Sequence, residues 1–387
     1  MPDVTQSDRT RRRFLEELGV SAATIVAGGG ICRLQAGATG RSARASGGIE
    51  SPDTPPAKTP RVRQEIDLAG RWRFQVDCRD DIQKLIDDQD EGQELAYFSP
   101  AFPTQDWREV TIPRAFDDCA PGMYKFRGIC WFSRQFEVPA SMRGRRVVAH
   151  FEGVNYSSSV WVNGKLVGRN EDAFLPFEFP VDEHLRYGES NLIVVRVDNL
   201  RRPAQLPTSE YWQGQGGILR EVKLVASDQA RVTHVSVMAV PGNDKGKFTL
   251  RATVTNGRSE SATFSLHVKI LNREGQPLAS FASTDLTIEP GKDGDFTVEG
   301  EVREVVAWSP ERPVLYTVRV ELLVGGMPAD QQETRFGFRR IEARDGKLWL
   351  NGKPLFLMGF DRHEDSPRTG MAVDLETSRQ DFLVLLR

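Results

Sequence analysis

Short runs of β-branched and other apolar residues, each bounded by turn-forming residues, dominate residues 62–228 of this chain. Four such runs cover residues 145–151, 158–162, 191–197 and 221–225. The pair Asn163-Gly164 directly follows the second run, and Asn-Gly between apolar runs signals a β-hairpin because both residues tolerate a positive φ. Many short strands with such punctuation predict an all-β sandwich over residues 62–228.

Strict alternation of apolar and polar residues marks the next segment, residues 229–338. It is clearest in the runs 249–254, 264–270 and 316–322. Alternation with a period of two indicates strands that bury one face and expose the other. A segment of about 110 residues of this kind suits an immunoglobulin-like sandwich.

The pattern changes again in residues 339–387. A strand over 347–350 turns at Asn351-Gly352 into the run 354–359, which is almost wholly apolar and therefore predicts a strand buried on both sides. A polar loop over 360–370 follows, and Asp374 is placed to cap a helix. Strand, loop and helix form one β/α unit. Because a (β/α)₈ barrel takes about 250 residues, we expect only the start of a barrel here.

Residues 1–45 have the layout of an export signal. Arg11-Arg12-Arg13 precedes a mildly apolar stretch over 18–31, and Ala43-Arg44-Ala45 supplies a cleavage site. This order is typical of a bacterial twin-arginine signal, so we expect a periplasmic or extracellular protein. An ordinary basic N-terminus is the alternative. Residues 46–61, rich in Ser, Pro and Gly, are expected to be a linker.

The composition limits the classes of binding partner that this chain can have. The chain has 51 basic and 54 acidic residues and a net charge of −3, which argues against a nucleic-acid binder. It has no run of about eighteen apolar residues, so no membrane contact is expected after signal cleavage. The His and Cys residues lack metal-ligand spacing, and no phosphate loop or nucleophile elbow occurs; neither metal nor cofactor is expected. A homo-oligomer is compatible with the sequence, which leaves the oligomeric state open.

Cysteines give no disulfide framework. Signal cleavage would remove Cys32 and leave Cys78, Cys119 and Cys130, an odd number. A bridge between Cys119 and Cys130 remains open, but buried thiols are favoured.

The segments 151–154, 160–164, 175–177, 197–199 and 216–220, followed by 351–354 and 359–365, together resemble glycoside hydrolase family 2. The resemblance implies a jelly-roll sugar-binding-like domain at 62–228, an immunoglobulin-like domain at 229–338 and a TIM barrel that begins at 339. The string Arg362-His363-Glu364-Asp365 is similar to β-glucuronidases, whereas Asp361 departs from the Asn or Gly of many relatives. The implied activity is that of an exo-β-glycosidase that retains configuration and acts on a terminal β-glycoside, glucuronide or galactoside.

Both catalytic glutamates of the family lie, by this resemblance, on later barrel strands, with the acid/base in an Asn-Glu pair. Residues 339–387 contain no such pair, and Asn170-Glu171 falls in the first sandwich. Glu364 and Asp365 are adjacent, so they are poorly placed to face each other across a sugar at the roughly 5–5.5 Å that retention needs. We assign no catalytic residue. The chain is expected to be the N-terminal portion of a longer enzyme, or a truncated gene model of one, and inactive alone.

One wall of the substrate site can be assigned. His363 follows the first barrel strand, at the end of the strands where TIM-barrel active sites lie. The resemblance implies that it contacts the sugar, and an imidazole can donate to or accept from a hydroxyl; a surface histidine held by Glu364 or Asp365 is the alternative. Arg362, Glu364 and Asp365 are expected to support the loop. Glu210 falls near a sandwich acidic residue that reaches the substrate in some relatives, or is a surface carboxylate.

A non-catalytic carbohydrate-binding or adhesion protein made of the two sandwiches is the second hypothesis. Tyr211 and Trp212 have side chains that can stack on a sugar ring, although aromatic residues in β domains are more often core. Trp161 is expected in the core because its neighbours alternate as a strand does.

Overall fold

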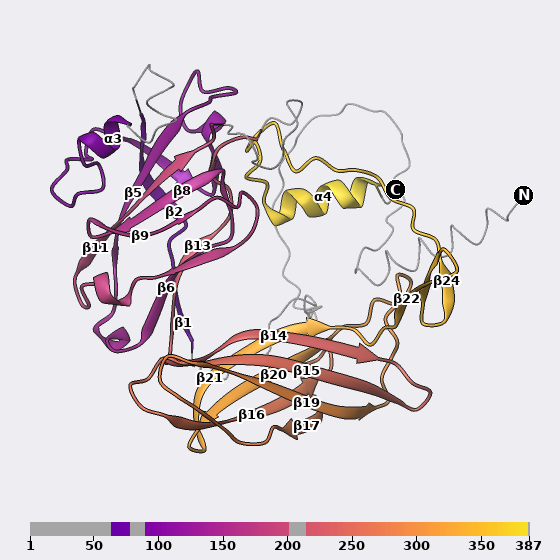
Figure 1. Ribbon diagram of the computed structural model, residues 1–387. Helices are drawn as coiled ribbons and strands as arrows, with labels where there is room; N and C mark the ends of the chain where they lie inside the picture. Colours follow the sequence, from indigo (N-terminus) through magenta and orange to yellow (C-terminus); the bar gives the residue numbers. More distant parts are fainter. Residues whose placement is uncertain (1–62, 78–89, 201–213, 386–387) are drawn as a thin grey trace, which may run out of the picture.

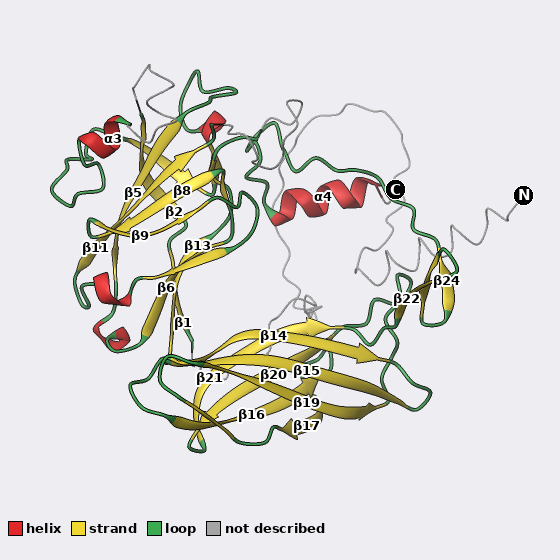
Figure 2. Ribbon diagram, viewed as in Figure 1, coloured by secondary structure: helices red, strands yellow, loops and turns green. Residues whose placement is uncertain are grey.

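The computed structural model describes residues 63–77, 90–200 and 214–385 (Figure 1, Figure 2). The expected signal and linker lie outside the described residues, as do Cys78, Glu210, Tyr211 and Trp212. The described chain forms two β-sandwiches, then a small sheet and one helix, which confirms the mainly β fold followed by a first β/α unit. No helix in the described ranges is long and apolar enough to cross a membrane.

The first sandwich packs a four-stranded antiparallel sheet on a six-stranded one. In sheet order, the smaller sheet contains β1 (Gln64–Asp67), β13 (Val222–Ser227), β6 (Arg146–Phe151) and β10 (Phe177–Pro180). The larger sheet contains β3 (Arg108–Ile112), β2 (Gly70–Val76), β5 (Ile129–Glu137), β11 (Ser190–Asp198), β8 (Ser157–Val162) and β9 (Lys165–Asn170). Trp72, Phe74, Phe132 and Phe151 fill the space between the sheets.

Short elements close the ends of this sandwich. They are β4 (Arg114–Ala115), β12 (Gly217–Ile218) and β7 (Val154–Asn155), which form a three-stranded sheet, and the 3₁₀ helices η1 (Phe116–Asp118), η2 (Ala140–Met142) and η3 (Asp182–His184). The predicted hairpin turn is confirmed: Asn163 and Gly164 join β8 to β9 with φ values of 49° and 82°. Cys119 and Cys130 are both free and buried, so buried thiols rather than a bridge are observed.

A segment of residues 90–107, here called the strap, covers part of the outer face of the six-stranded sheet. It contains α3 (Glu91–Glu94) and adds Tyr97 and Trp107 to a second apolar cluster with Trp131 and Trp161 of the sheet. Trp161 is 5% exposed, which confirms the prediction that it lies in a core. Arg196 Nε donates to Asp90 Oδ2 at 2.8 Å, and both side chains are buried. Burial of this aromatic face leaves it unavailable for stacking on a sugar.

The second sandwich shows the alternation expected from the sequence. One sheet contains β14 (Ala230–Val240), β15 (Lys245–Asn256) and β19 (Asp293–Arg303). The other contains β17 (Pro277–Ala282), β16 (Ala262–Leu271), β20 (Tyr316–Val324) and β21 (Met327–Phe336), with β18 (Leu286–Ile288) also paired to β16. The inward positions of these strands form the second main core, which includes Phe248, Leu250, Phe264 and Val320.

An ion pair joins the two sandwiches. Arg63, just before β1, donates from Nε to Asp330 Oδ1 at 2.8 Å and from Nη2 to Asp330 Oδ2 at 2.6 Å. Asp330 lies on β21 and is fully buried, and it also accepts from the backbone N of Val232 at 2.8 Å. This two-point contact is the geometry in which a guanidinium binds a carboxylate most strongly.

The last described residues form β22 (Ile341–Arg344), β23 (Lys347–Leu350), β24 (Lys353–Leu355) and α4 (Leu375–Leu385). The predicted cap is confirmed, because Asp374 Oδ1 accepts from Thr377 N at 2.6 Å. The prediction of a strand buried on both sides over 354–359 is wrong in this chain: β24 ends at Leu355, and Phe356 and Met358 are 84% and 88% exposed. A buried strand needs a neighbour on each side, and β24 pairs only with β23 among the described strands. The apolar face of α4 is open too, with Phe382 50% exposed.

Candidate functional site

The loop over residues 360–370 connects the end of β24 to the segment before α4. Arg362 ties this loop to the helix: Nη1 lies 2.7 Å from Glu364 Oε1, and Nη2 donates to Asp381 Oδ2 at 2.5 Å. Its guanidinium carbon also lies 5.8 Å from the centre of the Phe382 ring. Hydrogen bonding to Glu364, and then to Asp381, raises the pKa of Arg362. Glu364 is therefore engaged in an ion pair with Arg362.

His363 and Asp365 flank Glu364 on the same loop, and all three are exposed. An exposed imidazole between charged neighbours can exchange hydrogen bonds with a sugar hydroxyl near neutral pH. The roles of His363 in sugar contact, and of Arg362, Glu364 and Asp365 in loop support, remain predictions. Glu210 lies outside the described residues. Within the described ranges, no cluster of three or more His, Cys, Asp or Glu residues could hold a metal ion.

The far end of the loop is fastened to the first sandwich by a set of contacts that we call the clasp. Gln215 Oε1 accepts from Met371 N at 2.7 Å, and Arg220 Nη1 donates to Met371 O at 2.9 Å. Met371, only 4% exposed, packs with Ala372 against Ala115 and Leu219. The clasp therefore buries both the backbone and the side chain of Met371.

A glycine makes this close approach possible. Gly370 has a φ of 53°, and a Cβ on it would lie 2.0 Å from Gln215 Oε1. Only glycine combines that backbone conformation with no side chain. Gln215 is itself held in place, because its carbonyl oxygen accepts from Asn155 Nδ2 at 2.7 Å. The loop of His363 is thus anchored to a rigid part of the first sandwich.

The clasp residues were missed by sequence reasoning, although a signal for them existed. The stretch 216–220 carries a resemblance to the family but no predicted contact, and the small apolar run 371–373 lies between the predicted loop over 360–370 and the predicted cap at Asp374. A short apolar run between a polar loop and a helix cap indicates a docking point, but the sequence does not name its partner. Gln215 lies 156 positions from Met371 along the chain.

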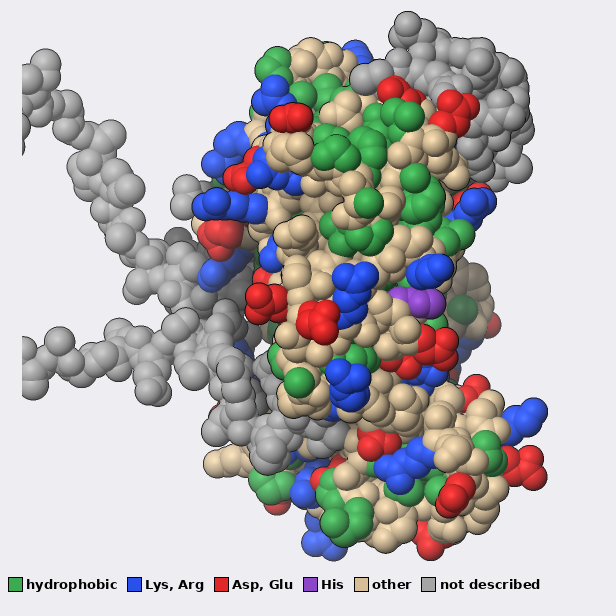
Figure 3. All heavy atoms as spheres, turned by 90° about the vertical axis from the view of Figure 1, so that its left-hand side faces the viewer, with side chains coloured by type: hydrophobic (Ala, Val, Ile, Leu, Met, Phe, Trp, Pro, Cys, Tyr) green, Lys and Arg blue, Asp and Glu red, His purple; other side chains and the backbone are tan. Residues whose placement is uncertain are grey.

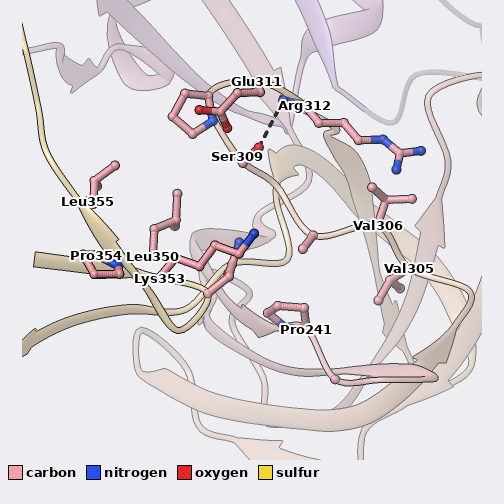
Figure 4. Close-up of a pocket in the computed structure, with 14 residues that line it drawn as sticks. Pro241, Val305, Val306, Ser309, Glu311, Arg312, Leu350, Lys353, Pro354 and Leu355 are labelled. Atoms are coloured by element: carbon pink, nitrogen blue, oxygen red, sulfur yellow. Dashed lines mark hydrogen bonds between the residues drawn. The ribbon is translucent and has the colours of Figure 1, made fainter. Parts of the chain in front are cut away.

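A larger cavity of about 580 Å³ lies between the second sandwich and the β23–β24 hairpin (Figure 4). Its walls mix apolar residues such as Pro241, Val305 and Leu350 with polar ones, and Glu311 is the one carboxylate among the described residues that line it. Glycoside hydrolysis uses two carboxyl groups, and no residue of the loop 360–370 lines this cavity. The candidate site is therefore the loop and clasp rather than the larger cavity.

Hydrogen bonds beside this cavity hold the turn of the β23–β24 hairpin. Asn351, at the turn between β23 and β24, donates from Nδ2 to Trp308 O at 2.9 Å, and its Oδ1 accepts from Arg340 N at 2.9 Å. On the wall of the cavity opposite the hairpin, Ser309 Oγ accepts a hydrogen bond from Arg312 N, as the dashed line in Figure 4 shows. The Asn-Gly turn therefore both reverses the chain and fixes the hairpin to the second sandwich.

Three models of one family match consecutive parts of this chain. The sugar binding domain of glycosyl hydrolases family 2 matches residues 67–228, the next family 2 domain matches 230–339, and the TIM barrel domain matches 341–387. The matched barrel segment is short beside the roughly 250 residues of a complete barrel.

Similar proteins include β-galactosidases and β-glucuronidases. A β-galactosidase of Thermoanaerobacter pseudethanolicus is 30% identical over 292 residues, which cover 73% of this chain and 38% of the relative. The β-galactosidase large subunit of Leuconostoc lactis is 28% identical, with 76% and 46% covered. A β-glucuronidase of Formosa agariphila is 25% identical, with 71% and 31% covered. The chain thus spans between 31% and 46% of the length of these relatives.

Solved structures share the fold. A β-glucuronidase of Bacteroides uniformis superposes with a TM-score of 0.71 at 24% identity, over 84% of this chain and 38% of that one. A β-glucuronidase of an uncultured Clostridium species gives a TM-score of 0.68 at 24% identity, over 86% and 54%. At this identity the likeness establishes the arrangement of the domains alone.

Proposed function

Because this chain belongs to glycosyl hydrolase family 2, we propose that it forms the substrate-positioning front part of an exo-β-glycosidase that retains configuration. The observation that carries the proposal is the clasp. It holds the loop of His363 against the first sandwich through Gln215 and Arg220. The first sandwich and the start of the barrel, which are far apart in sequence, thereby lie against each other. A terminal sugar would enter where they meet.

In this proposal each residue of the site has its own role. His363 exchanges hydrogen bonds with a hydroxyl of the sugar at the cleavage point, and Arg362 keeps the loop in place through Glu364 and Asp381. Asp365 supports the loop, and Glu210 is a further substrate-binding candidate by the family resemblance alone. The nucleophile and the acid/base, two carboxyl groups roughly 5–5.5 Å apart, would come from later barrel strands. This chain by itself would not hydrolyse a glycoside.

We favour a β-glucuronide over a β-galactoside as the substrate. The support is the Arg-His-Glu-Asp string at 362–365, which is similar to β-glucuronidases, since the relatives themselves bear both names. Recognition of the uronate carboxylate requires basic or amide groups, which we expect on the barrel loops beyond residue 387.

The test compares two proteins on aryl β-glucuronide and aryl β-galactoside. One is this chain, and the other extends it with whatever reading frame follows codon 387. We expect hydrolysis from the extended protein alone, with the glucuronide preferred. In that protein, His363→Ala should lower kcat/KM by about 10–100-fold, the scale of a lost hydrogen bond to a substrate. Full activity of the His363→Ala variant would remove His363 from the site, and activity of this chain alone would contradict the division of work.

We also propose that residues 1–45 direct export through the twin-arginine pathway to the periplasm or beyond. The support is the order of charge, apolar stretch and cleavage site in the sequence. A reporter fused to residues 1–45 should be exported, and replacing Arg11 and Arg12 by lysine should retain it inside the cell. Export of the lysine variant at the original rate would contradict the pathway. A homo-oligomer is tested separately by light scattering of the purified chain.

A further inference from the structure

The first sandwich carries a polar concavity, which we call the arginine groove. It has a volume of about 360 Å³ and lies along the strap on the outer face of the six-stranded sheet. Alternation along β2 buries Trp72 and Phe74 in the core and so turns Arg71 and Arg73 outward. Residues of the strap and of β5 complete the lining, among them Thr104, Gln105, Ser133 and Gln135.

Both outward guanidinium groups retain hydrogen-bonding capacity. The Arg71 side chain is 83% exposed, and its Nε lies 3.8 Å from Glu109 Oε1, beyond hydrogen-bonding distance. Arg73 donates from Nη1 to Trp107 O at 3.2 Å, and a guanidinium has five N–H donors. Arg134, by contrast, is directed to the carbonyl oxygens of Leu68 and Ala69. It lies on the inward side of β5 with Phe132 and Phe136 and offers the groove no open donor.

The lining selects a charged sugar. The two outward arginines, Arg71 and Arg73, face one glutamate in the groove, whereas basic and acidic side chains are mixed over the face of the molecule in Figure 3. A guanidinium binds a carboxylate through two parallel hydrogen bonds. The amides of Gln105 and Gln135 and the hydroxyl of Thr104 both donate and accept, as neighbouring sugar hydroxyls require.

We propose that the arginine groove binds a uronate residue of an acidic glycan, as an ancillary site apart from the loop of His363. The choice of a glycan rests on the proposed function. The course of β5 shows that the groove is separate from the clasp. This strand begins at Ile129, beside the contact between Gly128 N and Asn199 Oδ1, and that end of the strand lies on the clasp side of the sandwich. Ser133 lies four residues farther along this strand, which corresponds to about 13 Å. The groove would hold a part of the polymer remote from the terminal sugar.

The test measures binding of hexagalacturonate to this chain by calorimetry, with the carboxyl-reduced, neutral hexamer as the matched ligand. The charge-altered variant carries Arg71→Gln and Arg73→Gln. The control variant carries Arg169→Gln and Arg186→Gln, which remove the same charge from exposed positions of the same sandwich. We expect the charged hexamer to bind, the neutral hexamer to bind at least tenfold more weakly, and the groove variant alone to lose at least tenfold in affinity. Near-UV circular dichroism checks that both variants remain folded.

Three results would overturn the proposal. They are equal affinity for the two hexamers, an affinity of the groove variant within twofold of the unaltered chain, and equal binding of a single-stranded oligonucleotide of the same charge. The outcome is separable from that of the hydrolysis assay. In the extended protein, the groove variant should hydrolyse a small aryl glycoside at the unaltered rate, because such a substrate does not reach the groove.

Discussion

The ion pair between Arg63 and Asp330 offers a direct test of what holds the two sandwiches together. Replacing Arg63 by methionine keeps much of the side-chain volume and removes the charge. Asp330 is fully buried, so its carboxylate would retain only the hydrogen bond from Val232 N at 2.8 Å. Removing one partner of a buried pair costs about 3–5 kcal/mol. Because the Arg63 side chain is 26% exposed, water can partly replace it, and we expect the lower end of that range.

A loss of about 3 kcal/mol corresponds to a change of about 150-fold in the folding equilibrium. With a urea dependence of about 2 kcal/mol per molar, the unfolding midpoint should fall by about 1.5 M. Hydrogen exchange read by mass spectrometry at increasing urea is the suitable assay, since it follows peptides of β20 and β21 apart from those of β5 and β11. The loss should appear first in the second sandwich, which contains Asp330.

A matched control and a double variant sharpen this test. Arg71→Met removes an arginine that is 83% exposed and 3.8 Å from its nearest carboxylate, so it should cost less than about 0.5 kcal/mol. In Arg63→Met combined with Asp330→Asn, no buried charge is left unpaired, so the double variant should be more stable than Arg63→Met alone. A loss below about 1 kcal/mol for Arg63→Met would refute the reasoning, because the pair would then behave as a solvent-screened surface contact.

Three further predictions concern other contacts. Hydrogen bonding to Glu178, and then to Glu152, raises the pKa of His150 despite its burial; its stabilising effect is therefore complete below the unfolded pKa of about 6.5 and is lost as the pH rises through the folded value. Urea titrations of the chain and of His150→Gln should thus differ most at acidic pH and converge at alkaline pH; a constant difference would contradict this. Gly92→Ala places a Cβ 2.3 Å from Trp131 and should cost about 1–3 kcal/mol in thermal melts, whereas Gly359→Ala, with nothing within 4 Å, should not. Gln215→Ala should speed amide exchange of Met371 by about tenfold, the loss of one hydrogen bond, and an unchanged rate would show that Arg220 suffices.

Features that depend on neighbours in the sequence were predictable. The turns at Asn163 and Asn351, the cap at Asp374 and the alternating strands of the second sandwich each follow from the conformational preferences of a few adjacent residues. The interactions behind these features act between residues only a few positions apart, so a single sequence is sufficient to locate the features.

Features that depend on contacts between residues far apart in the sequence were not predictable. The apolar run 354–359 has the composition of a buried strand, but its exposure is decided by whether other strands lie beside it. The clasp joins Gln215 to Met371 across 156 positions, and nothing local in either residue names the other. The same holds for the candidate site: the loop residues could be assigned by resemblance, whereas the contact that fixes the loop could not.

The strap over the aromatic face has an optical consequence. Tyr97 lies with its ring centre 5.2 Å from that of Trp107 and 5.6 Å from that of Trp131, which in turn is 5.4 Å from Trp161. Rings this close and held at fixed angles couple their electronic transitions. The contribution of Tyr97 and Trp107 to the near-ultraviolet dichroism of this cluster therefore depends on the strap being seated, whereas the Trp131–Trp161 pair belongs to the sheet alone. Any event that lifts residues 90–107 from the sheet should be visible in that band without a label.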